Sequence, residues 1–154
     1  MTTALIDATD AHFAWMLGEA PSPPGLTLPP GGVEKAGVLR WLRRRLAAGA
    51  SHWLIVSTGE VVGLCSFKRP ADAAGIVELG YGVAPDRRRR GHARAAVACL
   101  VEAARARPGL TGLMAETATE NIASAKVLEA NGFSRAGVRT GPEDGVLLIW
   151  RRGL

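Results

Sequence analysis

The sequence predicts a mixed α/β domain, and we expect residues 1–154 to form it as a single unit. Segments with strand and helix patterns follow one another in the order β-α-α-β-β-β-α-β-α-β-β, which is typical of helices packed on a mixed sheet. Hydrophobic residues make up 47% of the chain and charged residues 21%, a balance that supplies a core of ordinary size. The length of 154 residues fits one domain, and the sequence contains no internal repeat.

The first part of the chain predicts a strand, two helices and a long loop. Residues 3–7 have the pattern of a short strand, and residues 9–18 that of a helix. Residues 22–32 hold four prolines and three glycines, which predict either a mobile loop beside a binding site or a simple connector. Residues 33–48 predict a second helix, because apolar side chains recur at helical spacing and arginines fill the other face. These apolar side chains are Val38, Trp41, Leu42 and Leu46.

Three strands are predicted in the middle of the chain. Residues 52–57 and 60–68 flank the dipeptide Thr58-Gly59, which favours a hairpin. After a turn, residues 76–84 predict a third strand, which stops at a Pro-Asp pair.

The C-terminal half predicts two helices that alternate with strands. Residues 89–106 show the clearest helix pattern, with an apolar face repeated at three- and four-residue intervals. Residues 112–119 predict a strand, and residues 121–130 a short helix that ends at an Asn-Gly pair suited to a left-handed cap. Residues 133–139 and 146–151 predict a final pair of strands.

The chain is basic, with a formal net charge of +5, and its arginines concentrate in residues 40–45 and 87–94. Such clusters suggest an anionic partner or a solvated face. The two cysteines, Cys65 and Cys99, have no histidine near them at zinc-ligand spacing, so we expect buried thiols and no metal site. No apolar run is long enough to span a bilayer, and the first residues lack the basic leader of a secretory signal. We therefore expect no membrane partner and a cytoplasmic location.

The most informative segment runs from residue 77 to 96, where a strand enters a basic loop that opens a long helix. A helix N-terminus presents unpaired N–H groups and the positive end of the helix dipole, so it favours an anion. Gly91 has no Cβ and Ala93 is small, so a bulky ligand can approach the backbone closely. With the arginines beside them, these features predict a pyrophosphate ligand. The spacing of the glycines matches neither the P-loop nor the dinucleotide-binding motif.

This segment resembles the coenzyme-A signature of the GNAT acetyltransferases. Arg88-Arg89-Arg90-Gly91-His92-Ala93 match the pattern (Q/R)-x-x-G-x-(G/A), after a strand that ends in a GY-x-V-x-P pattern. Residues 121–133 are similar to the N-x-x-S-x-x-x-x-x-x-x-G-F segment of the ribosomal-protein-acetylating subgroup. The order of elements also resembles the GNAT fold from about residue 3 to residue 151.

The resemblance implies that acetyl-CoA is the donor and that an amine is the acceptor. It places the pyrophosphate on the amides of the basic loop, the pantetheine arm beside the end of the 76–84 strand, and an asparagine of the following helix against the coenzyme. The residues that the resemblance assigns to the coenzyme are Val83, Arg88, Arg89, Arg90, Gly91, His92, Ala93, Arg94 and Asn121.

Two glutamates are candidates for a general base. Direct attack of an amine on the thioester needs no covalent enzyme intermediate, but a base would help to deprotonate the ammonium. Glu78 lies in a strand among apolar neighbours, where some GNAT enzymes place a glutamate, and burial would raise its pKa. Glu116 lies on the neighbouring strand, where other members carry a catalytic glutamate. For each residue, the alternative is a structural ion pair.

The departing thiolate needs a proton donor, and here the sequence departs from the family pattern. Many GNAT enzymes use a tyrosine in the helix that follows the asparagine, but that position is Leu128. The only tyrosine is Tyr81, on an earlier strand. Ser124 is the candidate that the resemblance to the N-x-x-S subgroup supports; a local hydrogen-bonding role and a proton from solvent are the alternatives.

Two other functions are alternatives to an acetyltransferase. A non-catalytic domain that senses acyl-CoA would bind the coenzyme without turnover. A nucleic-acid-binding domain is disfavoured, because the basic runs lack interleaved aromatic residues and no recognition motif is present.

The acceptor, a protein N-terminus or a small molecule, is expected to bind between residues 18–35 and the last hairpin. The tryptophans Trp41, Trp53 and Trp150 are expected in the core, and family analogy suggests a homodimer.

Overall fold

The computed structural model describes residues 2–154. The first half of the chain forms β1 (Thr3–Asp7), α1 (Asp10–Met16), α2 (Ala36–Ala47), β2 (Ser51–Ser57) and β3 (Glu60–Phe67). The second half forms β4 (Ile76–Val83), the short 3-10 turn η1 (Pro85–Arg87), α3 (His92–Arg105), β5 (Gly112–Ala118), α4 (Ile122–Ala130), β6 (Ser134–Gly141) and β7 (Gly145–Gly153).

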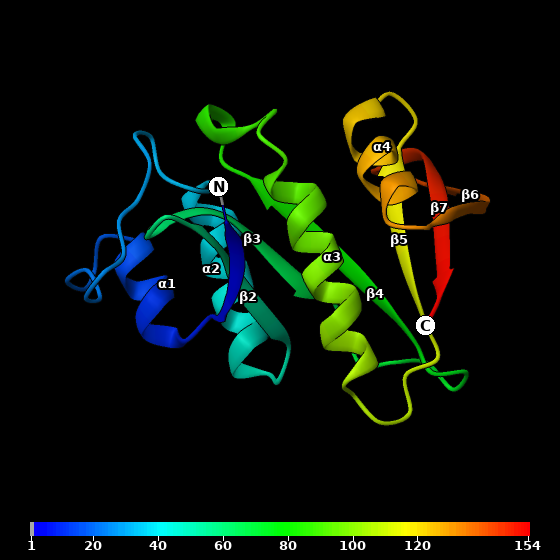
Figure 1. Cartoon of the computed structure of the whole chain (residues 1–154), viewed down its shortest axis with the longest axis horizontal. Helices are drawn as coiled ribbons and strands as arrows, with labels where there is room; N and C mark the ends of the chain where they lie inside the picture. The colour runs from blue at the N-terminus through cyan, green and yellow to red at the C-terminus, as the bar shows by residue number, and fades with distance from the viewer. Residues whose placement is uncertain (1) are drawn as a thin grey trace.

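The strands form one seven-stranded sheet with the order β1-β2-β3-β4-β5-β7-β6. Neighbouring strands are antiparallel except β4 and β5, which run parallel and are joined through α3 (Figure 1). This arrangement confirms the predicted mixed α/β fold class and the predicted order of elements.

The core consists of two layers, one on each face of the sheet. Alternate residues of a strand point to opposite faces, so a strand that is apolar throughout can be buried on both. In β2, Trp53 and Ile55 join the cluster under α3 and α4, whereas Leu54 and Val56 join the cluster under α1 and α2. The central strands therefore hold helices on both faces, and the buried apolar residues of β4 belong to the layer under α3 and α4.

Two helices begin later than the sequence predicts. The predicted helix 33–48 begins at Ala36, because Val33 is buried in the core and Lys35 has an extended conformation. The predicted helix 89–106 begins at His92, because Gly91 before it has a φ of 82°. The loop that precedes α3 is thus longer than expected.

The sheet opens between β4 and β5. The two strands pair only over Ile76–Glu78 of β4, opposite Gly112–Met114 of β5. From Leu79 to Val83, β4 still pairs with β3 but has no strand partner on its other edge among the described residues. Backbone groups on that edge are available to a ligand.

Candidate functional site

The loop before α3 has the backbone of an anion site. Arg89 and Gly91 have φ values of 64° and 82°, so two left-handed residues precede the first turn of the helix. Glycine adopts such a conformation without steric cost, whereas arginine does so at a cost. Successive backbone conformations of this kind gather N–H groups into a concave surface. Among residues 2–154, no side chain caps the start of α3. The helix N-terminus is therefore open to an anionic group.

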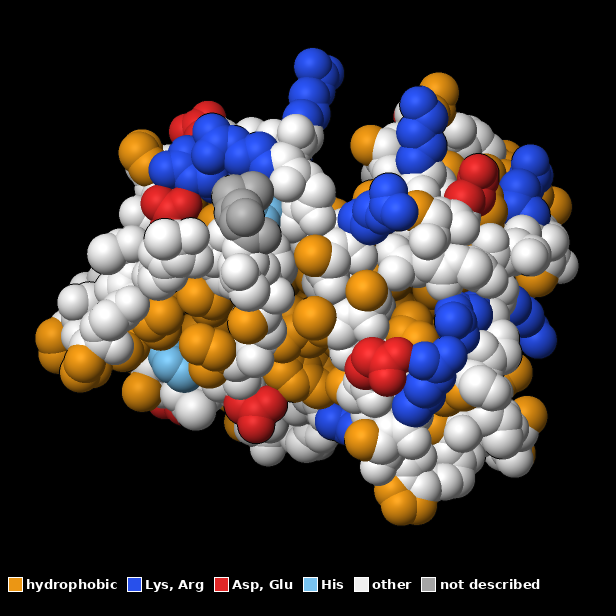
Figure 2. Space-filling model, viewed as in Figure 1, with side chains coloured by type: hydrophobic (Ala, Val, Ile, Leu, Met, Phe, Trp, Pro, Cys, Tyr) orange, Lys and Arg blue, Asp and Glu red, His pale blue; other side chains and the backbone are white. Residues whose placement is uncertain are grey.

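A cavity of about 540 Å³ opens above this loop, between the β4 edge, α3 and α4. Figure 2 shows Lys and Arg side chains on both sides of a hollow at the upper edge of the molecule. The cavity is lined by Tyr81, Gly82, Val83, Arg87, Arg88, Arg89, Gly91, His92, Ala93, Arg94, Asn121, Ala123, Ser124 and Val127. We call it the basic cavity. Its volume and its charge suit a large anionic ligand.

The basic cavity brings together almost all of the residues assigned to the coenzyme, and only Arg90 does not line it. His92 is buried and lies 3.2 Å from the hydroxyl of Thr3 through Nδ1, which ties the start of α3 to β1. Asn121 caps α4, because its Oδ1 accepts a hydrogen bond from the amide of Ser124 at 3.2 Å. The side chains of His92 and Asn121 thus hold the two helix starts that face the cavity.

The edge of β4 presents backbone groups to the basic cavity. The amide of Ala84 donates to the carbonyl of Val62 on β3 at 2.8 Å. Since successive residues of a strand direct their backbone groups to opposite edges, Tyr81 and Val83 direct theirs away from β3. Consistent with this, the Val83 carbonyl accepts a hydrogen bond from Nε of Arg88 at 3.1 Å. An extended ligand could pair with this edge as a strand would.

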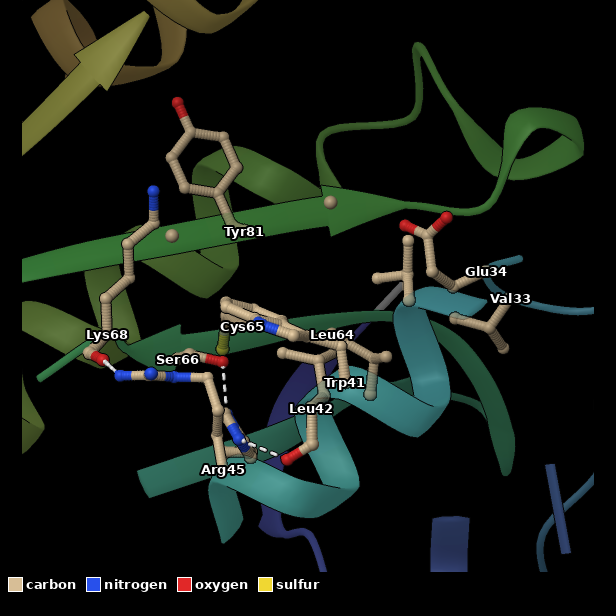
Figure 3. A pocket seen from close by; sticks show the side chains of 14 residues that line it. Val33, Glu34, Trp41, Leu42, Arg45, Leu64, Cys65, Ser66, Lys68 and Tyr81 are labelled. Atoms are coloured by element: carbon tan, nitrogen blue, oxygen red, sulfur yellow. Dashed lines mark hydrogen bonds between the residues drawn. The ribbon is translucent and has the colours of Figure 1, made fainter. Parts of the chain in front are cut away.

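A second, smaller cavity of about 170 Å³ lies on the other face of β4, between α2 and strands β3 and β4 (Figure 3). It is lined by Val33, Glu34, Val38, Trp41, Leu42, Arg45, His52, Leu64, Cys65, Ser66, Lys68, Gly80, Tyr81 and Gly82. We call it the α2 groove. Within it, burial lowers the pKa of His52, whose Nε2 lies 2.9 Å from the Leu42 carbonyl and whose Nδ1 lies 2.5 Å from the Ser66 hydroxyl. A neutral His52 fits these two contacts.

Of residues 18–35, only Val33 and Glu34 line the α2 groove; helix α2 forms its wall, and none of the lining residues belongs to the last hairpin. The expected acceptor site between residues 18–35 and that hairpin stays a prediction. The structure corrects a different expectation. Trp41 was expected in the core with Trp53 and Trp150, yet it is 48% exposed, whereas the other two are buried. The helical spacing of Trp41 matches both the core face and the groove face, so the pattern alone did not separate them.

The basic cavity and the α2 groove share two residues, Tyr81 and Gly82. The hydroxyl of Tyr81 donates to the carbonyl of Ser124 on α4 at 3.2 Å, and burial raises the pKa of Tyr81. Sequence reasoning did not include Tyr81 among the catalytic candidates. Its position two residues before Val83, and therefore on the same edge of β4, is the signal that could have identified it.

The other two positions considered for the proton donor lie on α4. Leu128 is fully buried in the core beneath α3 and α4, which suits an apolar residue. Ser124 lines the basic cavity, as a donor near the sulfur would have to.

Glu78 is buried, with 6% of its side chain exposed, and is paired with two cations. Its carboxylate oxygens lie 3.2 Å from Nζ of Lys68 and 3.2 Å from a guanidinium nitrogen of Arg69. Glu78 lines neither cavity, although Lys68 lines the α2 groove. The geometry shows an ion pair at the point where β4 and β5 separate.

Glu116 is likewise paired, in this case with an arginine of β6. Its two carboxylate oxygens accept hydrogen bonds from Arg139, through Nε at 2.5 Å and a terminal nitrogen at 3.2 Å. These bonds lower the pKa of Glu116 below its ordinary value. Glu116 lines neither cavity. Its carboxylate is therefore ionised at neutral pH and is a weaker base than a free glutamate.

Among residues 2–154, no group of three or more His, Cys, Asp and Glu side chains is placed to hold a metal ion. None of the helices within the same residues has the length and apolar character that crossing a membrane requires.

Comparison with known sequences identifies the domain type. The family model of the acetyltransferase (GNAT) domain matches residues 6–134. A protein of Bacillus subtilis (strain 168), named uncharacterized N-acetyltransferase YjdG, is 31% identical over 87 residues, which are 55% of this chain and 52% of that protein. The match thus spans about half the length of this curated relative.

Solved structures share the whole fold. RimL, a ribosomal L7/L12 α-N-protein acetyltransferase in complex with coenzyme A, has a TM-score of 0.76 at 17% identity and covers 100% of this chain and 95% of its own. The aminoglycoside acetyltransferase AAC(6′)-Ib with coenzyme A has a TM-score of 0.74 at 18% identity and covers 99% and 95%. A ribosomal-protein-alanine N-acetyltransferase from Brucella melitensis has a TM-score of 0.69 at 24% identity and covers 98% and 99%.

Proposed function

The chain belongs to the family of GNAT acetyltransferase domains, and we propose that it transfers the acetyl group of acetyl-CoA to a primary amine by direct attack in a ternary complex. The observation that carries the proposal is that the basic cavity and the α2 groove meet at Tyr81 and Gly82, where β4 has no strand partner toward β5. A donor and an acceptor that enter from opposite faces of β4 would meet at this junction.

The basic cavity is proposed as the donor site. The amides of the loop at Arg89 and Gly91 suit a pyrophosphate, and a Cβ at Gly91 would meet nothing within 4 Å, which leaves open space for one. The backbone groups of Val83 suit the amides of the pantetheine arm. Asn121 offers its amide nitrogen, since its oxygen is used as the cap of α4. RimL and AAC(6′)-Ib, which share the fold, were solved with coenzyme A, and this supports the assignment.

In the proposed reaction, the amine nitrogen forms a bond to the acetyl carbon, and the bond from that carbon to the coenzyme sulfur breaks. The amide of Tyr81 points toward the gap and is proposed as the hydrogen-bond donor to the acetyl oxygen. Because the acceptor enters as an ammonium and leaves as an amide, its nitrogen loses two protons. One of them goes to solvent and the other ends on the sulfur, with Ser124 or Tyr81 as the proposed donor to it.

Glu78 and Glu116 remain the proposed candidates for the base. If Glu78 removes the proton of the acceptor ammonium, Glu78→Gln should lower kcat more than it lowers the affinity for acetyl-CoA. The pH dependence of kcat/KM separates the two residues, because loss of the base removes the acidic limb of the profile. A limb lost only in Glu78→Gln assigns the base to Glu78, and one lost only in Glu116→Gln assigns it to Glu116. An acidic limb that persists in both variants would make both carboxylates structural.

The decisive experiment is calorimetric titration of the protein with acetyl-CoA, with ATP and NAD as controls. We expect selective micromolar binding, and release of free thiol when a suitable amine is added. Binding without thiol release, across protein N-termini and small amines, would instead indicate an acyl-CoA sensor. Absence of binding to any acyl-CoA would refute the proposal, and the basic surface would then be tested against nucleic acid at increasing salt.

Assembly into a homodimer is a further proposal. Strand β6 lies at an edge of the sheet, is exposed along all but its last residue, and carries Val138, which is 61% exposed. An exposed edge strand is a common site of pairing between copies. Sedimentation of the purified protein would test this, and a monomer at all concentrations would contradict it.

A further inference from the structure

The α2 groove has opposite charges at its two ends. Glu34 lies over Gly82, since its Oε2 would be 3.9 Å from a Cβ built there. Lys68 lies over Gly80, since its Cε would be 2.8 Å from a Cβ at that position. Figure 3 shows the two side chains over different parts of β4, with Arg45 on α2 at the Lys68 end. The negative end of the groove is therefore the end that adjoins Gly82 at the junction of the two cavities.

Within the part of the chain that the structure describes, no cationic side chain pairs with Glu34. Its Oε1 accepts a hydrogen bond from the amide of Lys35 at 2.9 Å, and it forms no ion pair with any side chain of residues 2–154. Glu78 and Glu116, in contrast, are paired with Lys68, Arg69 and Arg139. Of these three carboxylates near β4, Glu34 is the one available to an external cation.

The middle of the groove is apolar and includes an exposed aromatic ring. Trp41 is 48% exposed and Val38 is 38% exposed, and both line the groove. The guanidinium of Arg45 lies 5.1 Å from the centre of the Trp41 ring, which holds the ring in place. An exposed tryptophan in a cavity wall is suited to pack against an apolar or aromatic group.

We propose that the acceptor is a primary monoamine with an apolar body, whose ammonium is bound by Glu34 and whose body packs against Trp41. This inference rests on the proposed function. A second ammonium farther along the groove would meet Lys68 and Arg45, so diamines and aminoglycosides are poor acceptors. Buried His52 adds no positive charge, because its pKa is lowered. A small arylalkylamine and a polypeptide N-terminus with an apolar first residue share this chemistry.

Acetylation is measured by thiol release with four amines. They are phenethylamine, the same molecule with an aminomethyl group on its ring, methylamine, and a short neutral peptide amide that begins with phenylalanine. We expect kcat/KM for the diamine to be at least about 10-fold below that for phenethylamine. Preference for the peptide or for phenethylamine assigns the source of the amine. A preference for the diamine would overturn the proposal. So would a protein that binds acetyl-CoA but acetylates none of the four amines.

Two exposed positions allow variants that keep the fold. Glu34→Gln retains the acceptor oxygen for the Lys35 amide but removes the charge, and KM for phenethylamine should rise roughly 10-fold or more. Trp41→Ala should raise KM for phenethylamine more than for methylamine, since methylamine has no body to pack. Acetyl-CoA affinity should not change in either variant, and Glu129→Gln, an exposed carboxylate on α4, is the matched control. An unchanged KM for phenethylamine in both variants would overturn the proposal. If the unmodified protein does not bind acetyl-CoA, the proposed function is refuted instead.

Discussion

The basic cavity and the α2 groove lie on opposite faces of the same strand, but they are built from different parts of the chain. The features that suit the basic cavity to an anionic ligand include its arginines but depend on backbone geometry: the β4 edge at Val83, the left-handed loop at Gly91 and the two helix starts. The α2 groove is formed largely by side chains, such as Glu34 and Trp41. Where a ligand binds to backbone groups, only the positions whose Cβ would obstruct the ligand are restricted in residue type. These positions form a short motif with fixed spacing. A site made of side chains leaves no such motif.

The largest effect that tests this comparison is expected at Gly91. Gly91→Glu should raise the dissociation constant of acetyl-CoA by roughly 100-fold or more, because it places a carboxylate against the pyrophosphate. The left-handed φ of 82° adds a destabilisation of about 1 kcal/mol for any residue other than glycine. Calorimetric titration measures the first effect and thermal unfolding the second.

Gly109, near the other end of α3, supplies the control. Its φ is 84°, and a Cβ there would also meet nothing within 4 Å, so Gly109→Glu carries a similar backbone cost without touching the basic cavity. We expect it to lose stability and to retain acetyl-CoA binding. Equal losses of affinity in the two variants would mean that strain, and not the ligand contact, explains the effect at Gly91.

A smaller effect is expected where the two cavities meet. If Tyr81 donates a proton to the sulfur, Tyr81→Phe should lower kcat by about 100-fold with little change in acetyl-CoA affinity. A raised pKa keeps the phenol protonated at neutral pH, as a donor requires. Ser124→Ala keeps the backbone carbonyl that Tyr81 contacts, so it tests the serine hydroxyl alone. If kcat falls in Ser124→Ala and not in Tyr81→Phe, the serine is the donor.

The same contrast explains how much the sequence could predict. The positions of Gly91, Ala93 and Asn121 are restricted by the backbone they must adopt or cap, and the three residues singled out by the motif line one cavity. Trp41 was misplaced, because helical spacing does not distinguish an apolar residue on the core from one on a groove wall. Glu34 gave no signal, since a lone glutamate beside a loop has no pattern. Tyr81 became a catalytic candidate because β4 is unpaired toward β5 at this residue, which places Tyr81 where the two cavities meet.

The smallest predicted effect separates carboxylates that stabilise the sheet from the free carboxylate of the groove. The bonds from Arg139 lower the pKa of Glu116 in the folded state below its ordinary value of 4.5. A group of this kind stabilises the fold above its unfolded pKa, and the stabilisation is lost as pH falls through the folded pKa. Because Arg139 is 45% exposed, the contribution at neutral pH should be only about 1 kcal/mol.

The free energy of unfolding of Glu116→Gln should therefore lie below that of the unmodified protein at neutral pH, and the difference should shrink below about pH 4.5. Glu34→Gln should cost less stability at neutral pH, since among residues 2–154 Glu34 forms no ion pair that could be lost. Chemical denaturation from about pH 7 to about pH 3 measures both, and a Glu116→Gln difference that stays constant over this range would show that Arg139 does not stabilise the folded sheet through the charge of Glu116.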